Sequence, residues 1–220
     1  EKLIIPAKEL LGLEREETGE IIDDLADDRE IVIDFYEDKP YVFLAEEYLD
    51  ERSIADRIGV MLRFPPAKGR ISVSAIEEIE KKKGISFEQK QREAILTAVN
   101  DGLLVLTGGP GTGKTTTLNG ILELFEKKKL RVLLAAPTGR AAMRMSEVTG
   151  RQAKTVHRLL EVEWGEGDKP RFTRNIENPL EADAVIVDEL SMVDILLFSS
   201  FLKAVRPGTR LVLIGDSDQL

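Results

Sequence analysis

The 220-residue chain has no cysteine, a single histidine and a single tryptophan. Without cysteine there are no disulfides, thiolate metal ligands or cysteine nucleophiles. With a single histidine as well, we do not expect a zinc site. The lack of cysteine is typical of a reducing compartment, so we expect a cytoplasmic location. No apolar stretch approaches the ~18 residues of a membrane-spanning helix, so we expect no membrane partner.

The first residues, EKLIIPAKELLG, lack both the basic start and the long apolar segment of a secretory signal peptide. They also lack an initiator methionine, from which we expect that residues precede Glu1.

Negative charge is concentrated at one end of the chain. Residues 1–50 hold 17 acidic and 5 basic side chains, a net charge of −12, whereas the whole chain carries −9. Residues 51–220 are therefore slightly basic, and this part of the chain can carry a local positive surface that binds nucleic acid.

The acidic segment predicts a small module over residues 1–48. Helices are expected over 7–13 and 16–28, followed by strands over 30–36 and 41–45, an arrangement similar to a winged helix. The second helix would face a phosphate backbone with many carboxylates, so we favour a packing or protein-contact role over DNA binding.

Residues 49–83 predict a helical linker that is interrupted by PPAKGR, and the chain then changes character. From about residue 84, continuous apolar runs alternate with stretches typical of helices, such as residues 115–129 and 191–205. The runs are LLVLT (103–107), RVLLAA (131–136), AVIVD (184–188) and RLVLIGD (210–216). Such runs indicate strands that are covered on both faces, so residues 84–220 are expected to form an α/β domain with a mostly parallel sheet.

A phosphate-binding loop follows the first of these strands. TGGPGTGKTTT contains the pattern G-x-x-x-x-G-K-[ST] from Gly108 to Thr115 and opens a helix. The glycines let backbone N–H groups point at phosphate oxygens, Lys114 is expected to reach the β and γ phosphates of ATP, and the Thr115 hydroxyl to hold Mg²⁺. The candidate loop residues are Gly109, Pro110, Gly111, Thr112, Gly113, Lys114, Thr115 and Thr116.

The strand AVIVD ends in two adjacent acidic residues, Asp188 and Glu189. Neighbouring side chains at a strand end point in different directions, so one carboxylate can face the metal and the other an attacking water. We expect Asp188 to be the metal partner and Glu189 the general base. Both motifs follow strands at their carboxyl ends, where open α/β sheets bind ligands.

Further motifs accompany these two. They are FEQKQREAI (87–95), APTGRAA (136–142), TVHRLL (155–160) and GDSDQL (215–220). In this order the set resembles superfamily 1 helicases, most closely the 5'-to-3' group of RecD-type exodeoxyribonuclease V alpha subunits and their stand-alone relatives. The resemblance covers residues 84–220 and implies a first RecA-like motor domain that works in DNA recombination and repair.

The resemblance also implies roles for individual residues. Gln91 would contact the adenine and Gln219 would sense the γ phosphate, although Phe87 and Glu88 depart from the family's pattern. The residues implied to line a single-stranded DNA track are Pro137, Thr138, Arg140, Thr155 and His157. Arg140 as a solvated residue at a helix start, and His157 as a helix histidine without a ligand, are the open alternatives.

Other classes of protein share parts of this pattern. An AAA-type remodelling or clamp-loading ATPase would carry the loop and the acidic pair, but a single polar sensor in place of GDSDQL. A superfamily 2 helicase would have a Ser-Ala-Thr type signature there.

Motifs IV to VI, which helicases of this type place on a second RecA-like domain, have no counterpart in the chain. We therefore expect a missing second RecA-like domain in the same polypeptide, and partner subunits of a recombination or repair complex. As they stand, the 220 residues are expected to be a nucleotide- and DNA-binding domain with weak turnover.

Overall fold

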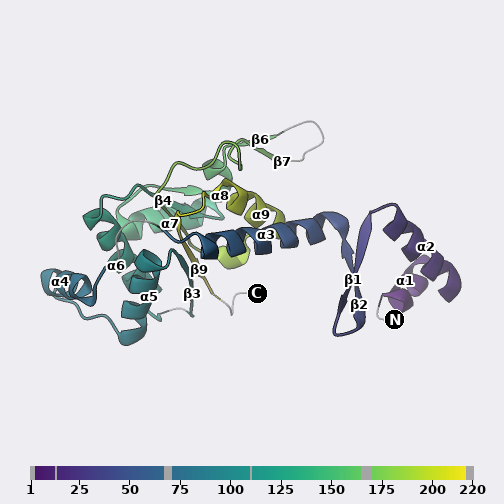
Figure 1. Ribbon diagram of the computed structural model, residues 1–220, viewed down its shortest axis with the longest axis horizontal. Helices are drawn as coiled ribbons and strands as arrows, with labels where there is room; N and C mark the ends of the chain where they lie inside the picture. Colours follow the sequence, from purple (N-terminus) through teal and green to yellow (C-terminus); the bar gives the residue numbers. More distant parts are fainter. Residues whose placement is uncertain (1–2, 13, 67–70, 110, 165–169, 217–220) are drawn as a thin grey trace. The chain divides into compact units, whose positions relative to one another are not determined.

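The computed structural model of the chain describes residues 3–12, 14–66, 71–109, 111–164 and 170–216. The chain divides into two compact units, Glu1–Ser53 and Ile54–Leu220, called here the N-terminal and the C-terminal unit. The helix α3 (Ala45–Arg63) contains the boundary between them (Figure 1).

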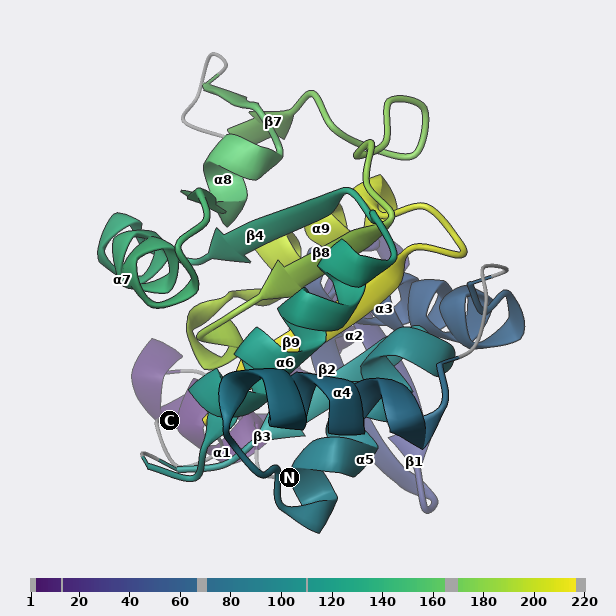
Figure 2. The same ribbon diagram turned by 90° about the vertical axis from the view of Figure 1, so that its left-hand side faces the viewer.

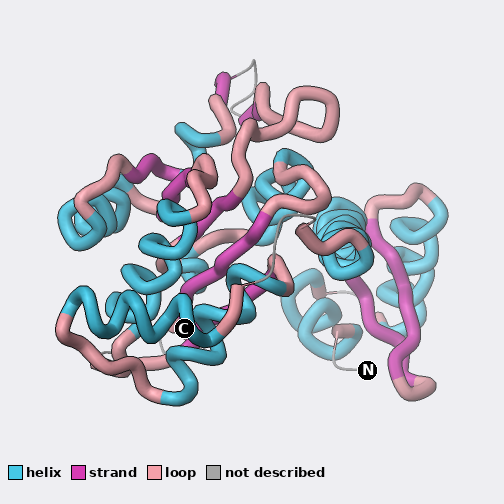
Figure 3. Tube along the Cα trace, turned by 60° about the vertical axis from the view of Figure 1, so that its left-hand side comes forward, coloured by secondary structure: helices cyan, strands magenta, loops and turns pink. Residues whose placement is uncertain are grey.

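The N-terminal unit contains α1 (Ile4–Leu11), α2 (Arg15–Asp27) and the hairpin β1 (Ile31–Tyr36) and β2 (Lys39–Leu44), followed by the start of α3 (Figure 3). Glu14 and Glu17 form a capping box that starts α2. The two turn residues Glu37 and Asp38 both have positive φ angles, as a two-residue hairpin with the right-handed strand twist requires.

Hydrophobic side chains of the N-terminal unit stay accessible to solvent. Over its described residues Thr18 is the only buried one, and no hydrophobic side chain is buried. A hydrogen bond of 2.8 Å from the Tyr48 hydroxyl to Asp34 joins α3 to the hairpin, and the Tyr48 ring lies 5.6 Å from that of Phe43. Local contacts therefore hold this unit together in place of a core.

The C-terminal unit is built on a parallel sheet. Within the described residues five strands pair in the order β3–β9–β8–β4–β5. Their bounds are β3 Leu103–Thr107, β9 Arg210–Gly215, β8 Ala184–Val187, β4 Val132–Ala136 and β5 Ala153–Thr155. The predicted α/β fold with a parallel sheet, as expected for a RecA-like domain, is confirmed.

Helices cover both faces of this sheet (Figure 2). One face packs against α5 (Gln89–Asn100), α6 (Lys114–Lys127) and α7 (Gly139–Thr149), and α4 (Val73–Lys83) packs against α6. The other face packs against the second half of α3, α8 (Val156–Leu159) and α9 (Ile195–Ala204). The 3-10 helix η1 (Leu190–Met192) precedes α9, and β6 (Val162–Trp164) pairs with β7 (Pro170–Phe172).

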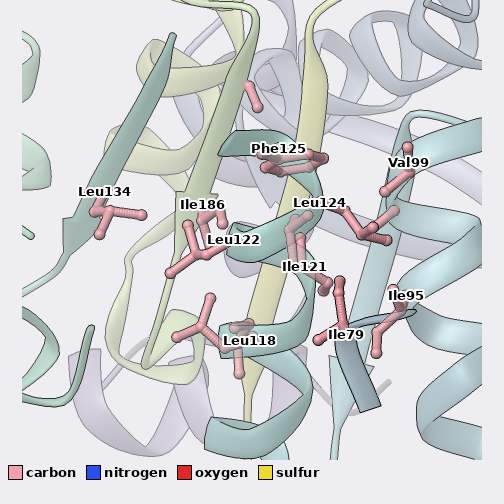
Figure 4. Packing of buried hydrophobic residues seen from close by; sticks show 14 of the residues in the cluster. Ile79, Ile95, Val99, Leu118, Ile121, Leu122, Leu124, Phe125, Leu134 and Ile186 are labelled. Atoms are coloured by element: carbon pink, nitrogen blue, oxygen red, sulfur yellow. The ribbon is translucent and has the colours of Figure 1, made fainter. Parts of the chain in front are cut away.

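Side chains along the central strands alternate between two hydrophobic clusters. Ile186 of β8 packs with Leu122 and other residues of α6, whereas Val185 and Val187 pack on the α9 side (Figure 4). Full burial of such a side chain stabilises the fold by roughly 1.5–3 kcal/mol. Burial on both faces explains why the strands are apolar throughout.

The second half of α3 is anchored to the end of α9. The guanidinium of Arg57 donates hydrogen bonds to the carbonyls of Leu202, at 3.2 Å, and of Val205. These carbonyls lie at the C-terminal end of α9, which carries partial negative charge. Burial lowers the pKa of Arg57 below its ordinary value, but the residue remains a cation at neutral pH.

The structure differs from the sequence-based expectations at two elements. The edge strand β5 has three residues, Ala-Lys-Thr, and was not predicted because it contains no apolar run. The helix expected over 191–205 starts at Ile195 because the Asp194 side chain accepts a hydrogen bond from the amide of Leu197 and caps it there. Among the described helices, none combines the length and the apolar character that crossing a membrane requires.

Candidate nucleotide site

The phosphate-binding loop lies between β3 and α6, as predicted. Gly113 is the N-cap of α6 and has a φ of +84°, a left-handed conformation that favours glycine. A Cβ atom at this position would also lie 2.3 Å from the Nε2 atom of Gln91. The pattern therefore needs glycine here for its backbone angle and for the close approach of a neighbouring helix.

Lys114 folds back over its own loop. Its ammonium donates hydrogen bonds to the carbonyls of Gly108 and, at 3.1 Å, of Gly109. The lysine is the first residue of α6, so its charge lies beside the partial positive charge of the helix N-terminus. The loop thus concentrates positive potential and backbone N–H groups at one point, which suits an anion such as a phosphate.

A cavity of ≈ 380 Å³ opens at this loop. It lies at the carboxyl ends of β3, β8 and β9 and is bounded on another side by α7. The predicted residues that line it are Gly109, Gly111, Thr112, Gly113, Lys114, Thr115, Asp188 and Glu189. The residues from the loop and from the acidic pair are about 74 positions apart in the sequence, and the fold brings them to one cavity.

The two acidic residues have different surroundings. The Asp188 carboxylate accepts a hydrogen bond of 2.9 Å from the amide of Glu189. Burial raises the pKa of Asp188 above its ordinary value of 3.8, and that hydrogen bond opposes the rise. The charges of Lys114 and Arg144 also oppose it. A partly buried carboxylate is a suitable partner for a divalent metal ion.

Glu189 has a left-handed backbone conformation, with φ 55° and ψ 41°. For a residue with a Cβ atom this conformation costs about 1–2 kcal/mol, and such strain is concentrated at functional sites. Asp188 is not among the residues with a positive φ, so the two neighbours differ in backbone conformation. The geometry agrees with two roles for two adjacent carboxylates.

The donor set fits a magnesium–nucleotide complex. The Thr115 hydroxyl and the Asp188 carboxylate lie in the lining of the same cavity and offer the oxygen ligands that Mg²⁺ prefers. Lys114 and the N–H groups of the loop offer donors to phosphates. The fit therefore rests on the chemical types of these side chains and on their position around one cavity.

Gln91 contacts the loop from α5. Its Nε2 atom donates to the carbonyl of Gly113 at 3.5 Å, and its Oε1 atom accepts from the amide of Glu88 at 3.0 Å. It does not line the cavity, so the adenine contact stays a prediction.

Phe87 and Glu88, which depart from the family pattern, have structural roles. Glu88 completes the capping box that starts α5. Phe87 is buried, and a Cβ atom on Gly120 of α6 would lie 2.8 Å from its ring. Phe87 therefore packs where α6 has no side chain, and the neighbouring Gln91 is held at the loop.

The residues predicted to line a DNA track lie beside the next two strands. Thr138 follows β4 and caps α7, where its hydroxyl oxygen accepts from the amide of Ala141. Thr155 ends β5 and caps α8 in the same way. Because Ala136 and Thr155 are register partners, the two caps are close together on the carboxyl edge of the sheet.

The other members of this set are Pro137, Arg140 and His157. Pro137 directly precedes the Thr138 cap, and Arg140 is an exposed residue in the first turn of α7. The ring of His157 is partly buried, with its centre 6.2 Å from that of Phe172. No residue of this set lines the cavity, so the structure separates a nucleotide group from a second polar group.

The remaining predicted site residues are Pro110, Gln219 and Thr116. Pro110 and Gln219 lie outside the described residues. Thr116 is an exposed residue of α6 and does not line the cavity.

The sequence model of a family described as an AAA domain matches residues 91–220, which is more than half of the chain. The chain belongs to this family. The matched range begins at Gln91 and includes the phosphate-binding loop, the acidic pair and GDSDQL. Membership implies the use of a nucleotide.

Curated relatives of this AAA-domain chain carry more specific names. It is 43% identical over 179 residues to the ATP-dependent RecD2 DNA helicase of Deinococcus radiodurans, which covers 81% of this chain and 24% of that protein. It is 38% identical over 206 residues to the RecBCD enzyme subunit RecD of Mycolicibacterium smegmatis, covering 81% of this chain and 35% of that protein. The predicted resemblance to RecD-type helicases is confirmed.

The match with solved structures is partial. A crystal structure of Bacteroides Pif1 bound to single-stranded DNA is 28% identical, covers 62% of this chain and 33% of that chain, and gives a TM-score of 0.44. The chain spans about a quarter to a third of the length of the two curated relatives.

The cavity also has lining residues that the sequence did not identify. Four of them come from α7, namely Ala141, Arg144, Met145 and Val148. Their spacing of three or four residues places them on one helical face, which was visible in the sequence. What the sequence lacked was any sign that this face turns toward a loop about 30 residues earlier.

Proposed function

We propose that this chain is the nucleotide-binding, RecA-like part of an ATP-dependent DNA helicase that acts in recombination and repair. The observation that carries the proposal is the convergence of Lys114, Asp188 and Glu189 on one cavity at the carboxyl edge of a parallel sheet. The names of its curated relatives indicate DNA as the class of substrate. Translocation in the 5'-to-3' direction is inferred from the resemblance alone.

The proposed chemistry divides among residues of the cavity. The loop amides and Lys114 bind the phosphates of ATP, and Thr115 with Asp188 hold Mg²⁺. When bound, Mg²⁺ supplies positive charge that neutralises the phosphates. Glu189 accepts a proton from the attacking water. Gln91 and Gln219 are proposed to contact the adenine and the terminal phosphate.

Single-stranded DNA is the proposed partner of Pro137, Thr138, Arg140, Thr155 and His157. Support comes from the placement of two helix N-termini, at Thr138 and Thr155, on neighbouring strands. N–H groups at helix N-termini bind phosphodiesters without selecting a base, which suits a translocating motor. The proposal includes the cytoplasm, where ATP and DNA are available, and partner subunits of the RecBCD type.

Two alternative functions would use the same cavity. An AAA-type remodelling ATPase would hydrolyse ATP without a response to DNA. A binding domain without turnover is favoured for these 220 residues by themselves, because they include none of the second-domain motifs whose arginines contribute about 10³–10⁵ in rate. Stimulation by single-stranded DNA, measured on these residues and on a protein that joins them to a second RecA-like domain, separates the candidates.

The first prediction separates ATP binding in the cavity from ATP hydrolysis. Lys114→Ala should weaken binding of Mg²⁺–ATP at least about tenfold, because it removes the charged donor to the phosphates. Glu189→Gln should keep binding within about twofold and reduce steady-state hydrolysis by about 10²–10⁴, the usual contribution of a general base. Binding is measured with a fluorescent ATP analogue and turnover by phosphate release.

Arg206→Gln is the matched control, since Arg206 lies in the turn before the opposite, amino end of β9. Normal hydrolysis by Glu189→Gln would remove Glu189 as the base. Strong DNA-stimulated turnover by the 220 residues alone would contradict the need for a second domain.

A further inference from the structure

Arg144 is the one arginine that lines the nucleotide cavity in the described part of the chain. It lies on α7 with Ala141, Met145 and Val148, which also line the cavity. Met145 is buried and fixes that face of the helix against the core, so Arg144 extends from a rigid element.

The guanidinium of Arg144 is available for a ligand. It forms no hydrogen bond or ion pair with any residue that the structure describes, and its side chain is accessible to solvent. By contrast, Arg151 just beyond the end of the same helix pairs with Glu126 of α6. Arg144 and Asp188 line the same cavity, so the guanidinium shares it with the proposed metal partner.

The charges of the cavity need a further cation. Among the residues that the structure describes, the acidic ones that line it are Asp188, Glu189 and Asp216, and the basic ones are Lys114 and Arg144. A triphosphate adds several negative charges, which the lysine alone does not balance. A guanidinium offers paired donors that match phosphate oxygens, and its charge is permanent.

We propose that Arg144 binds the terminal phosphate of a nucleoside triphosphate in this cavity and so distinguishes the triphosphate from the diphosphate. The proposal rests on the proposed function. The choice of the terminal phosphate follows from the cavity that Arg144 shares with Glu189, the residue proposed to act as the base where the terminal phosphate is cleaved.

The test compares two nucleotides on the 220-residue chain. Binding of Mg²⁺–AMP-PNP, a triphosphate analogue that is not hydrolysed, and of Mg²⁺–ADP is measured by isothermal titration calorimetry. Arg144→Gln should weaken AMP-PNP binding about tenfold and ADP binding less than twofold. Arg206→Gln removes the same charge at the opposite edge of the sheet and should change neither affinity.

Each outcome is decisive. Unchanged AMP-PNP binding by Arg144→Gln overturns the proposal, and an equal loss for both nucleotides overturns the assignment to the terminal phosphate. If that variant does not fold, Arg144→Lys keeps the charge without the paired donors, and a selective loss of about threefold is expected; no loss overturns the proposal. Absence of nucleotide binding by the unchanged chain would instead contradict the proposed function.

Discussion

Asp188 and Glu189 illustrate how neighbouring residues acquire different properties. Asp188 is partly buried after the end of β8, and this burial raises its pKa. Glu189 takes a left-handed backbone conformation. A carboxylate that lacks full hydration gains more from a metal ion than an exposed one does, because the ion replaces the lost solvation.

This burial predicts how stability depends on pH. The folded-state pKa of Asp188 is higher than its unfolded value, so the folded protein binds that proton more tightly. The carboxylate therefore destabilises the nucleotide-free protein fully above its folded pKa and not at all below the ordinary value of 3.8. Asp188→Asn should raise the melting temperature at neutral pH, with a gain that disappears as the pH falls toward that value.

Thermal unfolding without nucleotide and metal, at several pH values, measures this effect. Glu147→Gln on the exposed side of α7 serves as the control and should show no such gain. A melting temperature at neutral pH that is lower in Asp188→Asn than in the unchanged protein would contradict the assignment.

At the scale of elements, strands with long apolar runs were predictable and short capped elements were not. β3, β4, β8 and β9 lie where the runs placed them, because only central strands need apolar residues on both faces. The edge strand β5 is defined by pairing with β4 and not by its composition. Pairing partners and caps such as Asp194 depend on residues that are distant or ambiguous in the sequence.

The contact between α3 and α9 gives a prediction about elements. Arg57→Met should lower the free energy of unfolding by about 1–3 kcal/mol, because the carbonyls of Leu202 and Val205 lose charged donors. Arg63→Met is the matched control, since its described hydrogen bond goes to Gly59 in its own helix, and should change the free energy by less than about 0.5 kcal/mol. Urea unfolding measures both, and equal effects would contradict a special role for Arg57.

At the scale of the whole molecule, the two units differ in how they are stabilised. The C-terminal unit has a hydrophobic cluster on each face of its sheet, whereas the N-terminal unit buries no hydrophobic side chain among its described residues. The predicted boundaries at 48/49 and 83/84 followed composition. These boundaries stay a prediction; the division into two compact units falls between Ser53 and Ile54, within α3.

Hydrogen exchange should show this difference directly. Amides of the β1–β2 hairpin are expected to exchange at least about 100-fold faster, relative to their intrinsic rates, than those of β8 and β9. Mass spectrometry of peptic peptides from the 220-residue chain measures both regions in one experiment. Equal protection would mean that the N-terminal unit unfolds only with the whole molecule.

The candidate site was predictable where its residues follow one another in the sequence and not where the fold assembles it. The loop from Gly108 to Thr115 is a local pattern whose chemistry is inherent in its glycines and its lysine. Arg144 reaches the same cavity from a different helix, and only the packing of Met145 and its neighbours brings it there.

The order of the strands has a mechanical consequence. β3, β9 and β8 carry the nucleotide group, and β4 and β5 carry the second polar group, all in one ladder of hydrogen bonds. Strands in such a ladder cannot slide by fractions of a residue, since a change of one residue would reverse every side chain. The sheet is therefore rigid, and only loops and side chains at its edge can move the nucleotide group relative to the second polar group.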